Sequence, residues 1–221
     1  MAAVTGFAPR VRDGVRAALP LVPGPVLFGL TFGVLAQAAG MSVAAAVVMS
    51  GTTFAGSAQF AAVSVLEDGG TVVAAILSAI LLNARYAGMS VAVASVFPGS
   101  RVRRFFESQL IVDESWALSG RSGRFEWPIL VGAGLLLYVL WVPSTALGMI
   151  LGEGLGDPND LGLDAAFAAL FLALARPYLR GRRALEAAAL AAGITLVLLP
   201  FAPAGVPLIL AAVACLLGLR R

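Results

Sequence analysis

Residues 127–151 read WPILVGAGLLLYVLWVPSTALGMIL and contain no charged side chain. A helix needs about 20 consecutive apolar residues to cross the ~30 Å hydrocarbon core of a bilayer. A chain in lipid must also satisfy its backbone hydrogen bonds internally, which a helix does and an open strand does not. This stretch is therefore predicted to be a membrane-spanning α-helix.

The whole chain shares the apolar character of that stretch. Of its 221 residues, 60% are hydrophobic and 12% are charged, whereas a soluble domain usually carries about 25% charged residues. The mean hydropathy is +0.94. We therefore expect an all-α, polytopic integral membrane protein. Residues 1–221 would form one transmembrane domain that begins with a short cytoplasmic segment, residues 1–16.

Six further apolar stretches are separated by short segments that are polar or contain Arg. They cover residues 17–39, 42–66, 71–97, 163–179, 184–199 and 206–219. We expect a helical bundle with about six to seven membrane segments. In the first stretch, Gly29 and Gly33 have the GxxxG spacing of a helix-packing notch. Pro23 and Pro25 are expected to break the helix at its entrance.

The placement of arginine predicts the orientation of the chain, because cytoplasmic loops carry an excess of basic residues. Five groups are expected to face the cytoplasm: Arg10/Arg12/Arg16, Arg101/Arg103/Arg104, Arg121/Arg124, Arg176/Arg180/Arg182/Arg183 and Arg220/Arg221. Residues 152–163 contain no Arg and residues 200–207 contain no charge, so both loops are expected outside. Both termini are therefore predicted to be cytoplasmic.

The first three apolar stretches pose a counting problem. Three crossings cannot return the chain to its starting side, yet Arg clusters precede the first stretch and follow the third. Either one stretch does not cross, or residues 104–120 enter the membrane as an extra segment. Residues 42–66 are the preferred exception, because their middle, GTTFAGSAQ from Gly51 to Gln59, is rich in small and hydroxyl residues. We expect a broken helix there, since transporters place binding sites at such breaks.

Arg85 lies near the middle of the stretch 71–97, roughly 18 Å from the nearer end at ~1.5 Å per residue. An Arg at the centre of a membrane helix costs about 2.5–3.5 kcal/mol on insertion scales. It therefore needs a partner, water or a substrate, and Asn83 adds a second polar group close by. The alternative is that residues 71–97 form two shorter helices with Arg85 near an interface, which would also resolve the odd count.

Two adjacent acids, Asp113 and Glu114, lie in the segment 104–120. If this segment is one helix, Asp113 shares an apolar face with Leu110 and Ala117. An acid in such a position is a candidate for carrying a proton or for pairing with Arg85. The alternative is a surface helix on the cytoplasmic side with both acids solvated, and for Glu114 this alternative is favoured.

What the sequence lacks excludes several classes of protein. It contains no His and one Cys, so a Ser-His-Asp triad, a His-ligated zinc site and a disulfide framework cannot form. It contains no Lys, which removes a Ser-Lys dyad. The net charge of +3 is small and does not favour nucleic-acid binding. We expect neither an enzyme nor a protein that carries a metal or cofactor.

Three strings occur in order along the chain: FAGSAQF (54–60), LLNARY (81–86) and VDESWAL (112–118). With the Pro- and Gly-rich first helix, they resemble the AzlC-type family, the large permease subunits of branched-chain amino acid exporters. The similarity extends from about residue 14 to the C-terminus and is densest between residues 20 and 118. In this family the position of Tyr86 is commonly His, so a titrating imidazole is not available to this chain there.

The resemblance implies export of branched-chain amino acids, and in some members methionine, across the bacterial cytoplasmic (inner) membrane. The energy source it implies is the proton-motive force. It also implies a second, much smaller membrane subunit of the AzlD type, and therefore a hetero-oligomer.

The buried polar residues and this resemblance lead to one hypothesis for a substrate site. The substrate carboxylate is expected to meet Arg85, or backbone N–H groups freed at the Gly51–Gln59 break, which includes Gly56. Asp113 would be the proton-coupled acid or the ion-pair partner of Arg85. Further hydrogen bonds are expected from Ser57, Gln59 and Asn83. The rival hypothesis is a scaffold or assembly subunit that transports nothing, in which these side chains contact only protein.

Overall fold

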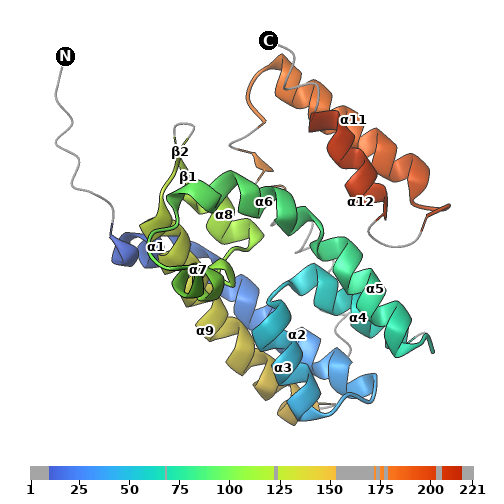
Figure 1. Cartoon of the computed structure of the whole chain (residues 1–221). Helices are drawn as coiled ribbons and strands as arrows, with labels where there is room; N and C mark the ends of the chain where they lie inside the picture. The colour runs from blue at the N-terminus through green and yellow to red at the C-terminus, as the bar shows by residue number, and fades with distance from the viewer. Residues whose placement is uncertain are drawn as a thin grey trace, which may run out of the picture.

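The structure is a computed structural model, which describes residues 10–67, 69–121, 124–152, 172, 175–176, 179–202 and 206–215. The described chain is almost wholly helical (Figure 1). Its helices are α1 (Val11–Ala18), α2 (Pro23–Ala38), α3 (Val43–Thr53), α4 (Gly56–Glu67), α5 (Val72–Asn83), α6 (Arg85–Val93), α7 (Arg101–Ser108), α8 (Asp113–Ser119), α9 (Trp127–Leu151), α11 (Arg182–Leu198) and α12 (Val206–Ala211). A short β-hairpin joins α8 to α9; its strands, β1 (Gly120–Arg121) and β2 (Arg124–Phe125), are two residues long.

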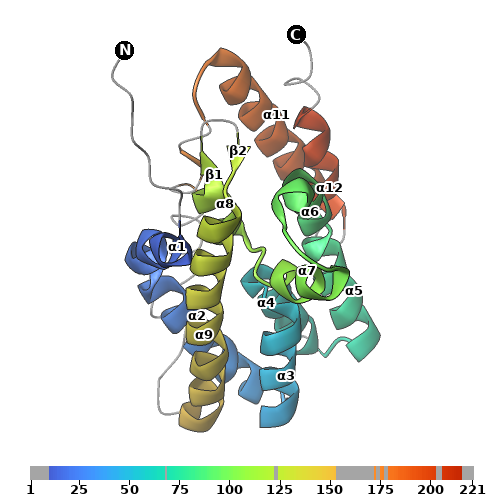
Figure 2. The ribbon, with the colours of Figure 1, turned by 60° about the vertical axis from the view of Figure 1, so that its left-hand side comes forward.

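α9 is the helix against which α1, α2, α3 and α8 pack (Figure 2). Its bounds are those predicted for residues 127–151. Gly14 of α1 lies against Ile129, near the start of α9, while Gly29 of α2 lies against Trp141. A Cβ atom at Gly29 would come within 2.9 Å of the Trp141 carbonyl oxygen, so glycine permits this close approach. Gly33, one turn farther along α2, lies against Gly148 and Met149, so α2 runs beside α9 in the same direction, whereas α1 packs only against the start of α9. The predicted packing role of Gly29 is confirmed.

Of the three positions predicted to break helices, Pro23 and Pro25 lie at the start of α2, and Gly51 lies within α3. α1 and α2 belong to two helical segments that meet at a bend of 65° between Leu21 and Pro23. Pro23 is the first residue of α2 and Pro25 lies in its first turn, where proline is tolerated. Gly51 lies inside α3, and the chain leaves that helix at Phe54, which adopts the left-handed conformation with φ 40°.

α3 runs against the direction of α9 and stops about half-way along it. The hydroxyl groups of Ser50 and Thr145 are 2.8 Å apart. One residue later, the Tyr138 hydroxyl donates to the carbonyl oxygen of Gly51 at 2.9 Å. The ring of Phe54 then packs edge-to-face on Tyr138. Tyr138 lies near the middle of α9, so α3 covers only one half of that helix (Figure 2).

α4 returns along the same half of α9. Its Gln59 accepts a hydrogen bond of 3.1 Å from Nε1 of Trp141. Farther along α4, Val63 packs in one apolar cluster with Ala46 of α3 and Met149 of α9. Residues 42–66 are therefore a helical hairpin that turns back at Phe54–Ala55, and the predicted broken helix is present.

α5 and α6 continue in one direction despite a small interruption. They form a segment, Val72–Val96, that is long and apolar enough to cross a bilayer. At Asn83 and Ala84 the helix tightens, because Ala84 donates to the carbonyl of Leu81, three residues earlier. Near the other end, Val93 packs in one cluster with Leu130, close to the start of α9. This segment is therefore interrupted as well, but it does not turn back.

The segment after α7 makes a second inward excursion, from the opposite end of α9. Glu107 of α7 accepts a hydrogen bond from Nε1 of Trp127, the first residue of α9. From there the chain runs along α9 toward its middle, where Val112 packs with Leu137. This turn between α7 and α8 forms a second helical hairpin. The two helical hairpins, α3–α4 and α7–α8, thus approach each other near the middle of α9.

α8 carries the chain back to the start of α9, where the Glu126 N–H donates to the Ser119 carbonyl at 3.0 Å. The condition that residues 104–120 form one helix is not met, because helical structure stops after Ser108 and resumes at Asp113. Asp113 therefore opens a separate helix, and it does not share a continuous apolar face with the residues of α7.

In the part of the chain that the structure describes, two helices are long and apolar enough to cross a membrane: Val72–Val96 and Trp127–Leu151. The bent pair Val11–Leu21 and Pro23–Ala38 would make a third. The predicted stretch 163–179 lies almost wholly outside the described residues. α11 and α12 pack on each other; α11 begins two residues before the predicted stretch 184–199, and α12 lies within the predicted stretch 206–219.

Candidate functional site

Arg85, the first residue of α6, joins the two hairpins through its side chain. Its Nη2 lies 2.8 Å from Oδ2 of Asp113, at the start of α8. The same nitrogen donates to Oγ of Ser57, in the first turn of α4, at 2.8 Å. The Tyr86 hydroxyl donates to Oδ2 of Asp113 at 3.4 Å. Three helices that begin near the middle of the bundle therefore bring one cation and one anion together.

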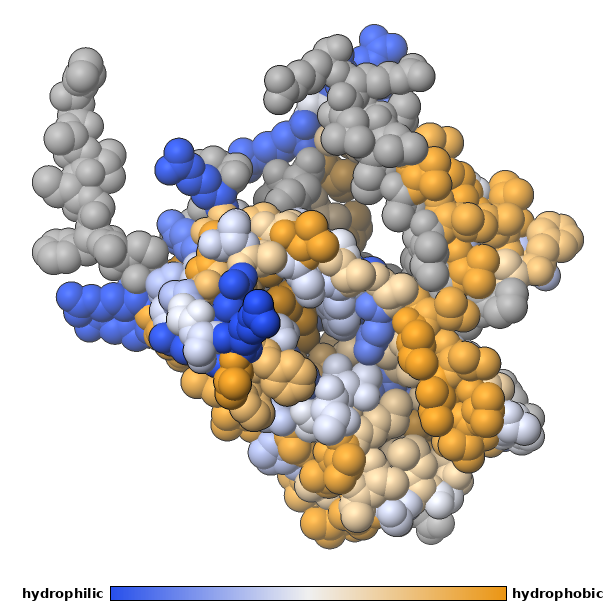
Figure 3. All heavy atoms as spheres, in the orientation of Figure 1, coloured by the Kyte–Doolittle hydropathy of each residue, from blue (hydrophilic) through white to orange (hydrophobic). Residues whose placement is uncertain are grey.

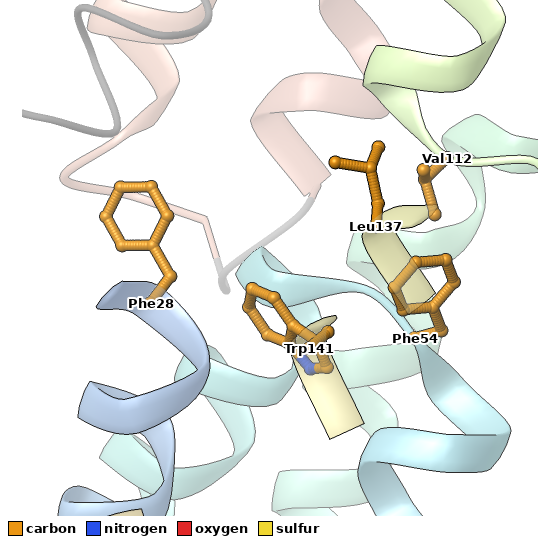
Figure 4. Packing of buried hydrophobic residues seen from close by; sticks show 5 residues of the cluster. All are labelled: Phe28, Phe54, Val112, Leu137 and Trp141. Carbon is orange, nitrogen blue, oxygen red and sulfur yellow. The ribbon is translucent and has the colours of Figure 1, made fainter. Parts of the chain in front are cut away.

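These residues line a cavity of about 50 Å³. Its polar wall consists of Gly56, Ser57, Arg85, Tyr86, Asp113 and Glu114. Its apolar wall is a buried cluster drawn from α2, α9 and the two helix breaks (Figure 4): Phe28, Phe54, Val112, Leu137 and Trp141. A cavity of this size holds a few water molecules and is smaller than a branched-chain amino acid.

The N-terminus of α4 points into this cavity. The left-handed residue Phe54 ends α3, and α4 begins two residues later at Gly56. The first N–H groups of a helix lack intrahelical partners and carry a partial positive charge. Since Gly56 and Ser57 both line the cavity, an anion placed there would face this helix end and Arg85 together.

A second polar cluster lies behind this wall and is sealed from the cavity. Gln59 is completely buried. Its Nε2 donates to Oγ of Ser50 at 2.8 Å, and Ser50 in turn contacts Thr145. Its Oε1 accepts from Trp141 Nε1 and from the Ala55 N–H. This cluster therefore holds the two halves of the broken helix against α9.

The carbonyl groups at the end of α3 are satisfied from outside the hairpin. Nε2 of Gln109 donates to the carbonyl oxygens of Gly51 and Thr52, at 3.1 and 2.7 Å. The Tyr138 hydroxyl reaches Gly51 as well. The last carbonyls of a helix otherwise lack partners. Gln109 and Tyr138 are therefore structural supports of the break that sequence reasoning missed.

The residues predicted for the site divide between three places. Gly56, Ser57, Arg85, Asp113 and Glu114 come together around the cavity. Gln59 lies in the sealed cluster described above. Asn83 lies on a separate apolar groove between α3 and α5, and its Oδ1 has no hydrogen-bond partner among the described residues. The sequence analysis considered Tyr86 only because this position is commonly His in the family. Nothing in the sequence indicated its contact with Asp113.

Glu114 does not lie on a solvated surface, which corrects the reading favoured from the sequence. It lines the cavity beside Asp113, on the short helix α8 that lies outside the two candidate spans. Removal of the carboxyl group from water, with the charge of Asp113 adding to it, raises the pKa of Glu114 to about 7. Burial therefore favours the protonated form of Glu114.

The residues that the structure describes contain no group of three or more Cys, Asp or Glu that could hold a metal ion. The site offers a guanidinium, a helix N-terminus, two carboxyl groups and an apolar wall. Such an arrangement can bind a small molecule that carries both a carboxylate and an aliphatic side chain, and it can take up a proton.

The model of the AzlC protein family matches residues 20–155, more than half of the chain. This chain belongs to the AzlC family. The matched region contains both hairpins, the segment α5–α6 and α9, so it includes every residue of the cavity wall.

Individual relatives agree with this assignment. An uncharacterized membrane protein of Archaeoglobus fulgidus is 33% identical over 77% of each chain. One from Helicobacter pylori 26695 is 23% identical over 76% of this chain and 75% of its own. The branched-chain amino acid transport protein AzlC of Bacillus subtilis 168 is 25% identical over 74% of this chain and 65% of its own. No solved structure matches. The chain is therefore a membrane protein of a transport family.

Proposed function

We propose that this AzlC-family chain is the large subunit of an exporter that moves Val, Leu, Ile and the similarly sized Met out of the cytoplasm. The B. subtilis relative is named as a branched-chain amino acid transport protein, which supports the substrate class. The observation that carries the proposal is the Arg85–Asp113 ion pair, set beside a helix N-terminus and an apolar wall.

In the proposed mechanism, the substrate carboxylate competes with Asp113 for Arg85. The ion pair is short and partly shielded, with side-chain exposures of 25% for Arg85 and 17% for Asp113. Breaking such a pair without a replacement leaves an uncompensated charge. An incoming carboxylate supplies that replacement, and the N-terminus of α4 at Gly56 and Ser57 adds donors for it.

The apolar wall would receive the aliphatic side chain of the substrate. Phe28 of α2, Trp141 of α9 and Phe54 at the break line the cavity. Because the cavity of about 50 Å³ is too small for leucine, binding requires the hairpins to move apart. The structure is therefore interpreted as a closed state.

Coupling to protons would use Asp113, whose ion pair with Arg85 the substrate breaks. When the substrate displaces Asp113, its carboxylate loses its cationic partner, and protonation relieves the buried charge. Glu114 lies next to it, with a pKa of about 7, and is suited to pass that proton. The proposed cycle is thus an exchange of one carboxylate for another on Arg85.

The proposed topology has about six to seven membrane segments with both termini in the cytoplasm. In a bilayer, the α3–α4 hairpin would enter and leave by the outer face, and the α7–α8 segment by the inner face. The hairpin removes one crossing, so the Arg clusters before α2 and in α7 come to lie on one side, as the positive-inside rule requires. This supports a multi-pass protein of the bacterial inner membrane.

A small subunit of the AzlD type is proposed as the partner, giving a hetero-oligomer. The segment Val72–Val96 has only 11% of its most apolar window buried, against 50% for Trp127–Leu151. It therefore has a large apolar surface to offer to lipid or to a second membrane protein. Asn83 adds a polar group beside the groove along that segment.

The proposal is tested by efflux of preloaded Val, Leu and Ile from cells that express this chain with and without a candidate small subunit. Efflux that needs both chains supports the proposal. An assembled complex that moves none of the three amino acids contradicts the substrate class.

The rival function, a scaffold subunit that transports nothing, makes a different prediction for the polar residues. If the cavity binds substrate, single cysteines placed at Ser57 and Arg85 in a Cys215→Ala background should react with small water-soluble thiol reagents. A cysteine at Gln59 should not react, because that position is sealed. Absence of reaction at Ser57 and Arg85 would favour the scaffold.

A further inference from the structure

α7 lies where two spans reach the same end of the protein. The span Val72–Val96 ends shortly before α7 begins at Arg101. Glu107, near the end of α7, accepts a hydrogen bond of 2.8 Å from Nε1 of Trp127, with which the span Trp127–Leu151 begins. α7 is thus placed at the depth where both spans leave the hydrocarbon core.

One side of α7 is fixed to the rest of the protein. The guanidinium carbon of Arg103 lies 5.0 Å from the centre of the ring of Trp127, whose Nε1–H donates to Glu107. Within α7, an ion pair of 2.7 Å joins Arg103 to Glu107. Arg104 donates a hydrogen bond to the carbonyl oxygen of Ala94. These contacts set the rotation of the helix about its axis, so its remaining side chains face away from the bundle.

The outward side of α7 is apolar and basic. Val102, Phe105 and Phe106 are exposed to 67%, 72% and 69%, and their spacing places them on one helical face. Arg101, which is also exposed, borders this face. In Figure 3, a blue patch and orange residues lie side by side over the position of α7. Bulky apolar side chains next to Arg are typical of helices that lie in a membrane interface.

We propose that α7 is an interfacial helix that binds anionic phospholipid at the Arg-rich end of the protein. Val102, Phe105 and Phe106 enter the boundary between headgroups and acyl chains, and Arg101 meets lipid phosphate. Charge complementarity favours an anionic lipid surface, because exposed Arg12 of α1 lies at the same end of α9. The inference does not depend on what the protein transports.

The test places a nitroxide label on α7 in the full chain, reconstituted into phosphatidylcholine vesicles with or without phosphatidylglycerol. Cys215→Ala removes the single native cysteine, and Phe106→Cys or Phe105→Cys then carries the label. With phosphatidylglycerol present, oxygen should relax these labels more than a water-soluble nickel complex does. The exposed Ser108→Cys, on the polar side of the same helix, is the matched control and should show the reverse order.

The anionic requirement is tested by lipid composition and by Arg101→Gln. Removing phosphatidylglycerol, or introducing Arg101→Gln in its presence, should increase the accessibility of the label at position 106 to the nickel complex several-fold. Two results would overturn the proposal. One is a label at position 106 that is as accessible to nickel as the label at position 108. The other is the same immersion in phosphatidylcholine alone.

Discussion

The two buried polar clusters of this protein differ in charge and in access to the cavity, although one broken helix contributes to both. The sealed cluster, Ser50, Gln59 and Thr145, is neutral, and hydrogen bonds link its members to one another and to Nε1 of Trp141, whose side chain lines the cavity. The cavity cluster, Ser57, Arg85, Tyr86, Asp113 and Glu114, is charged and lines open space. Ser57 and Gln59 are only two residues apart, yet they face different surroundings.

This difference separates what holds the helix break from what can bind a substrate. A neutral network with every partner in place is rigid and gives nothing to a ligand. An ion pair at the edge of a cavity can exchange one partner for another. Substitutions in the sealed cluster should therefore cost stability, and substitutions in the cavity cluster should cost transport.

Gln59→Leu should give the largest loss of stability. The change leaves Trp141 Nε1 and the Ala55 N–H buried without an acceptor. At ~1–3 kcal/mol for each lost partner, the free energy of unfolding should fall by roughly 2–6 kcal/mol. Thermal unfolding of the detergent-solubilised protein measures this effect. A variant that unfolds at the parent temperature would show that the sealed cluster does not hold the break.

Asp113→Asn should reduce efflux at least about tenfold while leaving substrate binding intact, because it removes the carboxylate that exchanges on Arg85. Leucine binding is measured by the shift in unfolding temperature on adding ligand, and efflux is measured in cells. Parent-like efflux in this variant would remove Asp113 from the coupling scheme.

Glu114→Gln should change the pH dependence of stability. Because the folded-state pKa of Glu114 is raised above its unfolded value to about 7, the folded protein binds the proton more tightly. This contribution is present at acid pH and is lost as the pH rises through about 7. The parent should therefore become less stable as the pH rises from about 4.5, the ordinary pKa of Glu, to about 7. The Gln variant should lack this part of the pH dependence, and an unchanged profile would contradict the assignment.

Ser57→Ala should have the smallest effect and serves as the matched control for Gln59→Leu on the same helix. It removes one hydrogen bond to Arg85, worth about 0.5–1.5 kcal/mol. The apparent affinity for leucine should fall by roughly two- to tenfold, with little change in unfolding temperature. A loss of stability as large as that of Gln59→Leu would erase the distinction between the two clusters.

Much of the fold followed from the sequence because lipid leaves few solutions. An uncharged run such as residues 127–151 has to be a helix, and it is. The odd number of apolar stretches between two Arg clusters indicated that one does not cross, and the small residues of 51–59 indicated which. The interruption after α7 was missed, because neither proline nor glycine marks residues 109–112.

The candidate site was predicted only in part. Arg85, Ser57 and Asp113 were identified because a charge or hydroxyl in an apolar stretch needs a partner. Sequence does not show which way a side chain points, so Gln59 was grouped with Ser57 although it faces α9. Glu114 was expected in water, because its place in the cavity depends on how α8 packs and not on local pattern.

The most direct test of the central claim, that Arg85 binds the substrate carboxylate, is leucine efflux by Arg85→Ala and Arg85→Lys in cells that also express the small subunit. The account predicts that Arg85→Ala abolishes efflux while the protein remains folded in the membrane, and that Arg85→Lys retains part of it. Normal efflux by Arg85→Ala would contradict the account, because the cavity would then bind its substrate without the cation.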